Sequence, residues 1–140
     1  MSRVFWDTHL FIYLVEATGP LAQRAAHIAA RMNARGDQLI TSTLTLGELL
    51  VKPVAAGDSR LAGQYTDVIK RNAILVPFDE AAAAVYASIR TDRTVKAPDA
   101  IQLSCAARFQ VDLFITNDDH LSKKLVPGIQ FITSLARAPF

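Results

Sequence analysis

The segment Leu113-Phe114-Ile115-Thr116 is followed directly by Asn117-Asp118-Asp119, and this order of residues decides the fold. A short apolar run bounded by polar residues predicts a strand that is covered on both faces, as strands of parallel sheets are. A second run, Val4-Phe5-Trp6, is followed in the same way by Asp7. In open α/β sheets, ligands bind beyond the carboxyl ends of the parallel strands. Both runs therefore predict acids at the sheet edge where chemistry takes place.

Five segments of this kind predict strands, and helical patterns alternate with them. The expected strands are residues 3–6, 38–41, 74–77, 111–116 and 129–132. The expected helices are residues 21–34, 43–52, 59–71, 80–90 and 98–109. Gly36 and Pro53 predict the ends of the first two helices, Asp79 the N-cap of the fourth, and Pro98 the first turn of the last. This alternation predicts an α/β fold, a three-layer sandwich around a parallel sheet.

Length and composition limit the class of protein. The 140 residues correspond to one domain, residues 1–140, and 51% hydrophobic against 20% charged residues exclude a disordered chain. No apolar run approaches the roughly 20 residues of a membrane-spanning helix. The single cysteine, Cys105, excludes an intramolecular disulfide and a cysteine-rich zinc site. We expect a cytoplasmic protein without membrane association.

The charge balance is informative only together with the positions of the acids. The net charge is +2, from 15 basic and 13 acidic residues. If four acids gather in one hollow, the remaining surface is mildly basic. Such a surface suits a polyanion whose phosphate lies on metal ions in the hollow.

Each acid also has an ordinary interpretation. Asp7 and the Asp118–Asp119 pair fit strand-to-helix turns and N-caps, and Asp99 fits the first turn of a helix, where the helix dipole favours a carboxylate. Glu48 lies in a helix that is apolar nearly all round, so we expect it to be buried beside a basic group or a metal ion. A partly exposed position of Glu48 is the alternative.

The four acids together favour a metal site over four separate structural roles. Carboxylates gathered in one crevice repel one another, and a hard divalent cation such as Mg²⁺ or Mn²⁺ removes that repulsion. No cluster of histidine or cysteine competes for a softer metal, because His9, His27 and His120 are scattered along the chain. His9 and His120 each follow a candidate acid by two residues, which allows a minor role near the site, but an ordinary surface or helix-end position is the favoured interpretation of each.

Four motifs in order carry a resemblance to a known family. They are Val4-Phe-Trp-Asp7-Thr8, Ser42-Thr-Leu-Thr45-Leu-Gly-Glu48-Leu, Ala97-Pro-Asp99-Ala100-Ile101-Gln-Leu-Ser-Cys-Ala-Ala107 and Ile115-Thr116-Asn117-Asp118. The chain thereby resembles the PIN-domain ribonucleases, and most closely the VapC-type toxins of type II toxin–antitoxin pairs. The resemblance spans nearly the whole chain. It implies a PIN-like α/β/α sandwich with a parallel sheet of about five strands.

The resemblance also implies an activity and a set of site residues. The activity is that of an endoribonuclease dependent on Mg²⁺ or Mn²⁺, which hydrolyses RNA phosphodiester bonds and leaves 5′-phosphate and 3′-hydroxyl ends. The residues that match the family's catalytic and metal-binding acids are Asp7, Glu48, Asp99 and Asp118. The supporting positions are Thr8, Thr116, Asn117 and Asp119. The implied partners are the RNA substrate, a cognate VapB-like antitoxin and a second copy of the chain in a homodimer.

Side chains around the acids allow further expectations. Lys52, Arg93, Lys96, Lys123 and Lys124 lie near the acids in sequence and could face the RNA backbone, although surface loops are commonly charged. Residues Arg24, Arg31 and Arg35 read as an exposed helix face. The aromatic residues of the N-terminal segment, including Tyr13, fit core or dimer packing better than base stacking.

Three other functions remain as alternatives. A phosphatase-like hydrolase with Asp7 as nucleophile needs a second Asp two residues later, where this chain has His9. A receiver-like signalling domain needs an acidic pair near the N-terminus, which is not evident. A catalytically silent PIN-like module that binds RNA or a protein partner is the remaining alternative, because an intact set of acids shows capacity and not activity.

Overall fold

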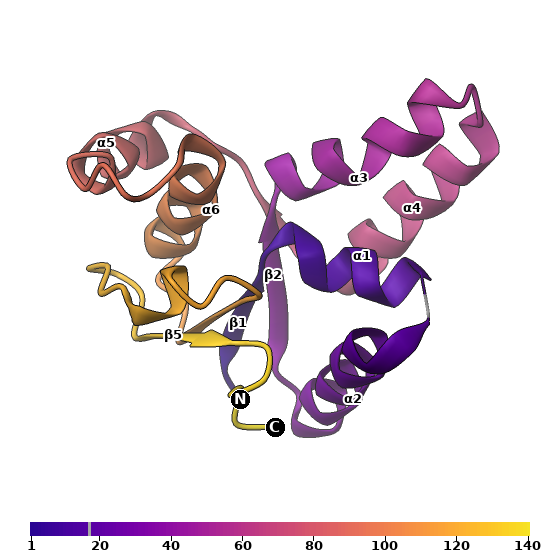
Figure 1. The fold of residues 1–140 in the computed structure, drawn as a ribbon, viewed down its shortest axis with the longest axis horizontal. Helices are drawn as coiled ribbons and strands as arrows, with labels where there is room; N and C mark the ends of the chain where they lie inside the picture. Colours follow the sequence, from indigo (N-terminus) through magenta and orange to yellow (C-terminus); the bar gives the residue numbers. More distant parts are fainter. Residues whose placement is uncertain (17) are drawn as a thin grey trace.

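The computed structural model describes residues 1–16 and 18–140, which form a five-stranded sheet between two layers of helices (Figure 1). The elements in chain order are β1 (Arg3–Trp6), α1 (Thr8–Glu16), α2 (Gly19–Arg35), β2 (Gln38–Ser42), α3 (Thr43–Ala55), α4 (Ser59–Asn72), β3 (Ile74–Val76), α5 (Glu80–Ile89), α6 (Ala97–Arg108), β4 (Leu113–Thr116), the short 3-10 helix η1 (Leu121–Lys123) and β5 (Phe131–Ser134). Neighbouring strands are parallel, in the order β3-β2-β1-β4-β5. The expected three-layer α/β sandwich is confirmed.

Successive residues of the central strands enter two different cores. Phe5 of β1 and Phe114 of β4 face α5 and α6, and their rings stack with centroids 5.0 Å apart. Val4, Trp6 and Ile115 face the opposite layer, which α1, α2, α3 and α4 form (Figure 1). Because side chains alternate across a strand and both faces are covered, every position must be apolar. This explains why the strands read as continuous hydrophobic runs.

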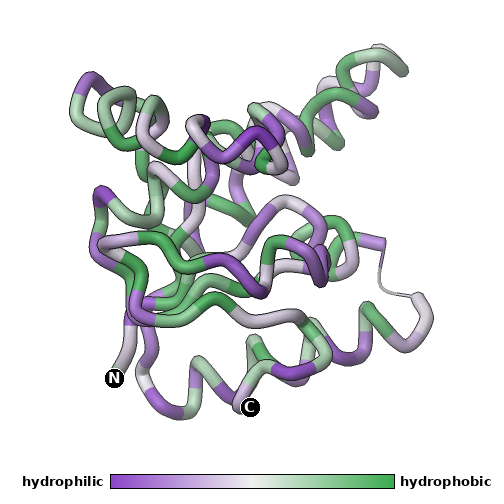
Figure 2. The backbone as a smooth tube through the Cα atoms, turned by 60° about the vertical axis from the view of Figure 1, so that its left-hand side comes forward, coloured by the Kyte–Doolittle hydropathy of each residue, from purple (hydrophilic) through white to green (hydrophobic). Residues whose placement is uncertain are grey.

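The helices cover the sheet with one apolar stripe each. In α2 the buried residues Ala22, Ala25, Ile28 and Met32 recur every three or four positions, as the alternating colours along this helix show in Figure 2. Helix α2 ends at Gly36, whose φ of 73° is the left-handed conformation of a C-cap. Among the described residues, no helix has both the length and the hydropathy that crossing a membrane requires.

Four of the five strands differ from their expected bounds. Strand β2 ends at Ser42, one residue later than expected. Strand β5 begins two residues later than expected, since Ile129 packs into the core from the preceding turn. Strand β4 begins at Leu113, because the N–H of Val111 still bonds to the carbonyl of Ala106 at the end of α6. Strand β3 ends at Val76, one residue early. Apolar character alone does not distinguish a strand from a buried turn.

Helix α3 continues through Pro53, where the sequence predicted its end. Pro53 lies in the last turn and its ring is buried, so the helix loses one hydrogen bond and keeps the packing. The N–H of Ala56 bonds to the carbonyl of Lys52 and closes that turn. Helices α3 and α4 then form an arm that extends away from the sheet (Figure 1), with Val51 and Val54 mostly exposed.

The C-terminal residues are fastened to α2 by one arginine. The guanidinium of Arg24 donates to the carbonyl oxygens of Leu135, Ala138 and Phe140 at 3.2, 2.7 and 2.9 Å. The expectation that Arg24 belongs to an exposed helix face is therefore wrong. Arg31, on the same helix, is exposed as expected.

Candidate metal and catalytic site

The pairing of β1 with β4 brings the first and last candidate acids to one edge of the sheet. Trp6 lies opposite Ile115 in the parallel register, and the N–H of Asp7 donates to the carbonyl of Ile115 at 3.3 Å. Asp7 and Thr116 therefore leave their strands side by side. Helix α6 begins at the same edge and presents Asp99 in its first turn.

Two adjoining hollows contain all the residues that the sequence predicted for the site. The larger hollow, about 390 Å³, is lined by Asp7, His9, Asp99, Thr116, Asn117, Asp118 and Asp119. The smaller, about 120 Å³, is lined by Asp7, Thr8, His9, Glu48, Pro98, Asp99 and Gln102. Four acids, Asp7, Asp99, Asp118 and Asp119, thus share the larger hollow, whereas Glu48 reaches the site from the smaller one.

Asp7 lies at the base of both hollows and is the most desolvated of the acids. Burial raises the pKa of its carboxyl above the ordinary value, and several donors act in the opposite direction. These donors are the hydroxyl of Thr116 and the backbone N–H groups of His9 and Asn117. The hydroxyl of Thr116 also accepts the N–H of Asp118 at 3.1 Å, so this buried side chain links two of the acids.

Asp99 is surrounded by other negative charges. Burial raises the pKa of Asp99 first, and the charges of Asp118 and Glu48 raise it further, against the lowering effects of His9 and Lys96. Repulsion of this kind is what a divalent cation relieves. The electrostatics of Asp99 therefore agree with the clustering of acids that the sequence predicted.

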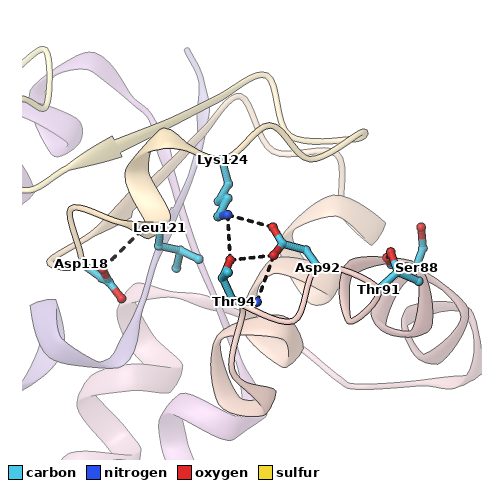
Figure 3. Close-up of polar contacts among 7 residues, drawn as sticks. All are labelled: Ser88, Thr91, Asp92, Thr94, Asp118, Leu121 and Lys124. Atoms are coloured by element: carbon cyan, nitrogen blue, oxygen red, sulfur yellow. Dashed lines mark hydrogen bonds and ion pairs between the residues drawn. The ribbon is translucent and has the colours of Figure 1, made fainter.

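Asp118 also has a structural role. Its Oδ1 accepts the backbone N–H groups of His120 and Leu121 at 2.9 and 3.3 Å, which fixes the start of η1. Lys124, at the end of η1, donates to Asp92 and to Thr94 at 2.8 and 2.9 Å (Figure 3). This network joins the segment after Asp118 to the loop that leads into α6. Lys124 is consequently engaged with protein groups.

Glu48 is exposed, so the expectation of a buried glutamate is wrong. The apolar residues around it lie on the protruding α3–α4 arm, where several of them face solvent. One carboxylate oxygen of Glu48 accepts the hydroxyl of Thr8 at 2.5 Å. No cation is needed to compensate its burial, and its link to the site runs through Thr8.

Sequence reasoning assigned no clear role to three residues at this edge. His9 lines both hollows, and its distance of two residues from Asp7 was the available signal. Gln102 lines the smaller hollow, one helical turn after Asp99. Tyr13, expected in packing, accepts the side-chain amide of Asn117 at 2.6 Å. Burial, and then the charge of Asp7, raises the pKa of Tyr13.

The donor chemistry fits a hard divalent cation. The acidic side chains that line the hollows are carboxylates, which Mg²⁺ and Mn²⁺ prefer, and His9 contributes the one imidazole among the lining residues. Within residues 1–16 and 18–140, however, no three acidic, histidine or cysteine side chains stand close enough together to hold a metal ion. Binding therefore requires the acids to draw closer together.

Comparisons with known proteins agree with this architecture. The family model described as PIN domain matches residues 4–124. The solved structure of VapBC2 from Rickettsia felis, bound to a DNA fragment from its promoter, has a TM-score of 0.74 at 13% identity, covering 94% of this chain and 98% of that chain. VapBC-5 from Mycobacterium tuberculosis has a TM-score of 0.62 at 22% identity, covering 95% and 99%. DNA-bound VapBC from Salmonella typhimurium has a TM-score of 0.67 at 21% identity, covering 96% and 99%. No curated protein sequence matches.

Proposed function

The chain belongs to the PIN-domain family, and from that premise we propose that it is an endoribonuclease dependent on a divalent metal ion, acting as the toxin of a toxin–antitoxin pair. The supporting observation is the convergence of Asp7, Asp99 and Asp118 on one hollow at the carboxyl edge of the sheet. Burial raises the pKa values of Asp7 and Asp99, and the charges of Asp118 and Glu48 raise that of Asp99 further, which supports a concentration of negative charge around Asp99.

Asp7, Asp99 and Asp118 are the side chains that would hold Mg²⁺ or Mn²⁺, with Glu48 beside them and Asp119 at the rim. When bound, a divalent cation supplies Lewis acidity for phosphodiester hydrolysis. Thr116 holds Asp7 and the backbone of Asp118 in place through its hydroxyl. No side-chain nucleophile is required for this chemistry.

RNA is the proposed substrate class. The four acids Asp7, Glu48, Asp99 and Asp118 account for a large part of the chain's 13 acidic residues, which leaves a basic remainder around an acidic hollow. Phosphate groups are attracted to such a surface and would be drawn to a cation in the hollow. By analogy with the family, cleavage leaves a 5′-phosphate and a 3′-hydroxyl.

An antitoxin is the proposed protein partner. Solved structures of three VapBC complexes share this fold, and each match covers 94% or more of this chain. A VapB-like protein that covers the hollow would keep RNA away from the acids. We also propose that the chain forms a homodimer, as family analogy suggests.

Cleavage of a mixed cellular RNA pool tests the function. Purified protein, stripped of partner by unfolding and refolding, is incubated with RNA in Mn²⁺, Mg²⁺ or chelator. Discrete fragments are expected with metal only, and Asp7→Asn should abolish them. Asp67→Asn is the matched control, because Asp67 is exposed on α4 outside both hollows.

Two results would contradict the proposed function. If refolded, metal-loaded protein cuts no RNA, or if Asp7→Asn cuts as well as the wild type, the endoribonuclease assignment is wrong. Retained RNA or partner binding without cleavage would then identify the silent PIN-like module as the correct alternative.

A further inference from the structure

A buried hydrogen-bond network lies directly beneath the smaller hollow. Its members come from α1, β2, α3 and α6, and each is at most 6% exposed. They are Thr8, Thr41, Ser42, Thr45 and Gln102. Buried hydroxyls and amides are costly unless every donor and acceptor is matched, so the direction of each bond can be determined. That direction shows what the network does.

Glu48 determines the direction of the hydrogen bond at one end of the network. An ionised carboxylate only accepts hydrogen bonds, so the single hydroxyl proton of Thr8 is donated to Glu48 across 2.5 Å. The oxygen of Thr8 can then only accept from its other neighbours. Gln102 supplies that donor, with Nε2 at 3.1 Å from the Thr8 oxygen.

The remaining hydrogen bonds fix the orientation of the side-chain amide of Gln102. Its Nε2 also donates to Thr45 at 2.8 Å, and its Oε1 accepts the hydroxyl of Ser42 at 2.5 Å. Thr41 donates to the carbonyl of Trp6 at 2.8 Å, which leaves Thr41 as acceptor for Thr45, also 2.8 Å away. The oxygen of Thr8 also lies 3.2 Å from that of Thr45, and the single proton of Thr45 goes to the nearer oxygen of Thr41, so every proton is used once. A reversed amide would place a carbonyl against Thr8, which has no second proton.

We infer that Gln102 is a positioning residue for the metal site, acting on Glu48 through Thr8. Gln102 holds the hydroxyl of Thr8 as a donor, and Thr8 in turn holds one oxygen of the exposed Glu48 carboxylate at the smaller hollow. The second oxygen of Glu48 is left for the cation. This inference rests on the proposed function, because it assigns Glu48 to the proposed metal site.

The network also connects the other acids of the site. Thr8 follows Asp7 directly, and Gln102 stands one helical turn after Asp99 on α6. The bond between Thr8 and Gln102 therefore ties α1 to α6 immediately behind two acids. Groups that orient metal ligands in this way commonly change metal affinity or activity by about 10–100-fold when removed.

Binding of Mn²⁺ to the RNA-free protein tests the inference, measured by calorimetry and by the electron paramagnetic resonance signal of free Mn²⁺. Gln102→Met and Thr8→Val are each expected to weaken binding by about 10-fold or more. Thr8→Ser, which keeps the hydroxyl, should recover most of the affinity lost in Thr8→Val. Ser104→Ala is the control, since Ser104 is buried on the same helix but bonds to Ile101 outside the network.

A double-mutant cycle separates positioning from general damage to the fold. In a Glu48→Gln background, Gln102→Met should weaken Mn²⁺ binding no further, because its effect passes through the carboxylate of Glu48. Equal effects of Gln102→Met with and without Glu48 would overturn the inference. Should Gln102→Met fail to fold, Gln102→Leu replaces it, because leucine removes the donor without adding a carboxylate to the hollow.

The possible failures are distinguishable. If the wild type binds Mn²⁺ with the expected cycle but cuts no RNA, the proposed function fails and the positioning role of Gln102 stands. If the wild type binds no Mn²⁺, or the variants bind it as tightly as the wild type does, the positioning role is rejected. RNA cleavage by the wild type decides the proposed function separately.

Discussion

Protonation of Asp7 and Asp99 makes the stability of the fold depend on pH. Burial raises both pKa values, and the charges of Asp118 and Glu48 add to the effect at Asp99. An acid with a raised pKa binds its proton more tightly in the folded chain than in the unfolded one. The free energy of unfolding therefore falls as the pH rises from the ordinary value of 3.8 through the folded-state pKa.

Asp99→Asn should remove the part of this loss of stability that the charge of Asp99 causes. In chelator at about pH 7 the variant is expected to be more stable than the wild type by a few tenths to about 1 kcal/mol, because solvent screens the partly exposed carboxyl. The difference should be smaller at about pH 5 than at about pH 7, because the wild-type carboxyl has a raised pKa and becomes more protonated as the pH falls. Urea unfolding at both pH values measures it, with Asp67→Asn as the control.

Binding of a metal ion should make the wild type more stable than Asp99→Asn. Mn²⁺ is expected to raise the Tm of the wild type more at about pH 7 than at about pH 5, since protons compete for Asp7 and Asp99. Asp99→Asn should gain less from Mn²⁺ at either pH. A wild-type gain that is independent of pH would contradict the assignment of these carboxyls as ligands.

At the scale of single residues, sequence reasoning could find the acids but could not find how they are held. Asp7 and Asp118 follow apolar strands, and that position alone predicts the sheet edge. Gln102 and Tyr13 carry no such signal, because their partners are 94 and 104 positions away in the sequence. Glu48 was expected to be buried because its neighbours are apolar, which does not show that α3 projects from the body.

At the scale of elements, the ion pair between Lys124 and Asp92 holds two loops of the site together (Figure 3). Hydrogen bonds from Lys124 and Thr94 hold the pKa of Asp92 well below its usual range. Asp92→Asn is expected to speed amide exchange in residues 91–96 and 121–125. Global stability should change little, since the pair is partly exposed and screened by solvent.

Hydrogen–deuterium exchange with mass spectrometry measures this effect. Arg93→Gln is the matched control, because Arg93 is adjacent, exposed and makes no ion pair among the described residues. High salt should reproduce part of the effect in the wild type by screening the pair. Equal exchange in Asp92→Asn and Arg93→Gln would show that the ion pair does not restrain the loops.

Arg24 has an analogous role between α2 and the C-terminal residues. Arg24→Met is expected to lower the free energy of unfolding by about 2–3 kcal/mol, because three carbonyl oxygens lose a charged donor. Arg31→Met, on the same helix, should change it by less than about 0.5 kcal/mol. Chemical denaturation of both variants checks the difference, and equal losses would mean that the three bonds contribute no net stability.

Existence and type of most elements followed from hydropathy patterns, whereas their ends depended on tertiary packing. Gly36 and Asp79 marked helix ends correctly, since a left-handed C-cap and an N-cap are local features. The predicted bounds of β4 and β5 were wrong because Val111 and Ile129 are buried in the core from turns, outside the strands. Pro53 did not end α3 because a proline in a last turn removes a single bond.

At the scale of the whole molecule, the alternation of strands and helices was enough to predict a parallel three-layer sandwich. The order of the strands was not predicted, because hydropathy does not show which strands are neighbours. The central place of β1, between β2 and β4, is the feature that assembles the site. Asp7 meets Asp118 only because the first strand pairs with the fourth.

That central place has a consequence for the chain while a ribosome is still making it. The N–H of Arg3 bonds to Asp112, 109 positions later, and β1 cannot pair with β4 until residues 113–116 have been synthesised. Asp7 emerges early, but Asp118, which completes the group of acids around it, lies in the last quarter of these 140 residues. Products of premature termination before Leu113 should therefore be harmless to cellular RNA and readily degraded. Under the proposed function, a site able to cut RNA cannot form before Asp118 has been synthesised.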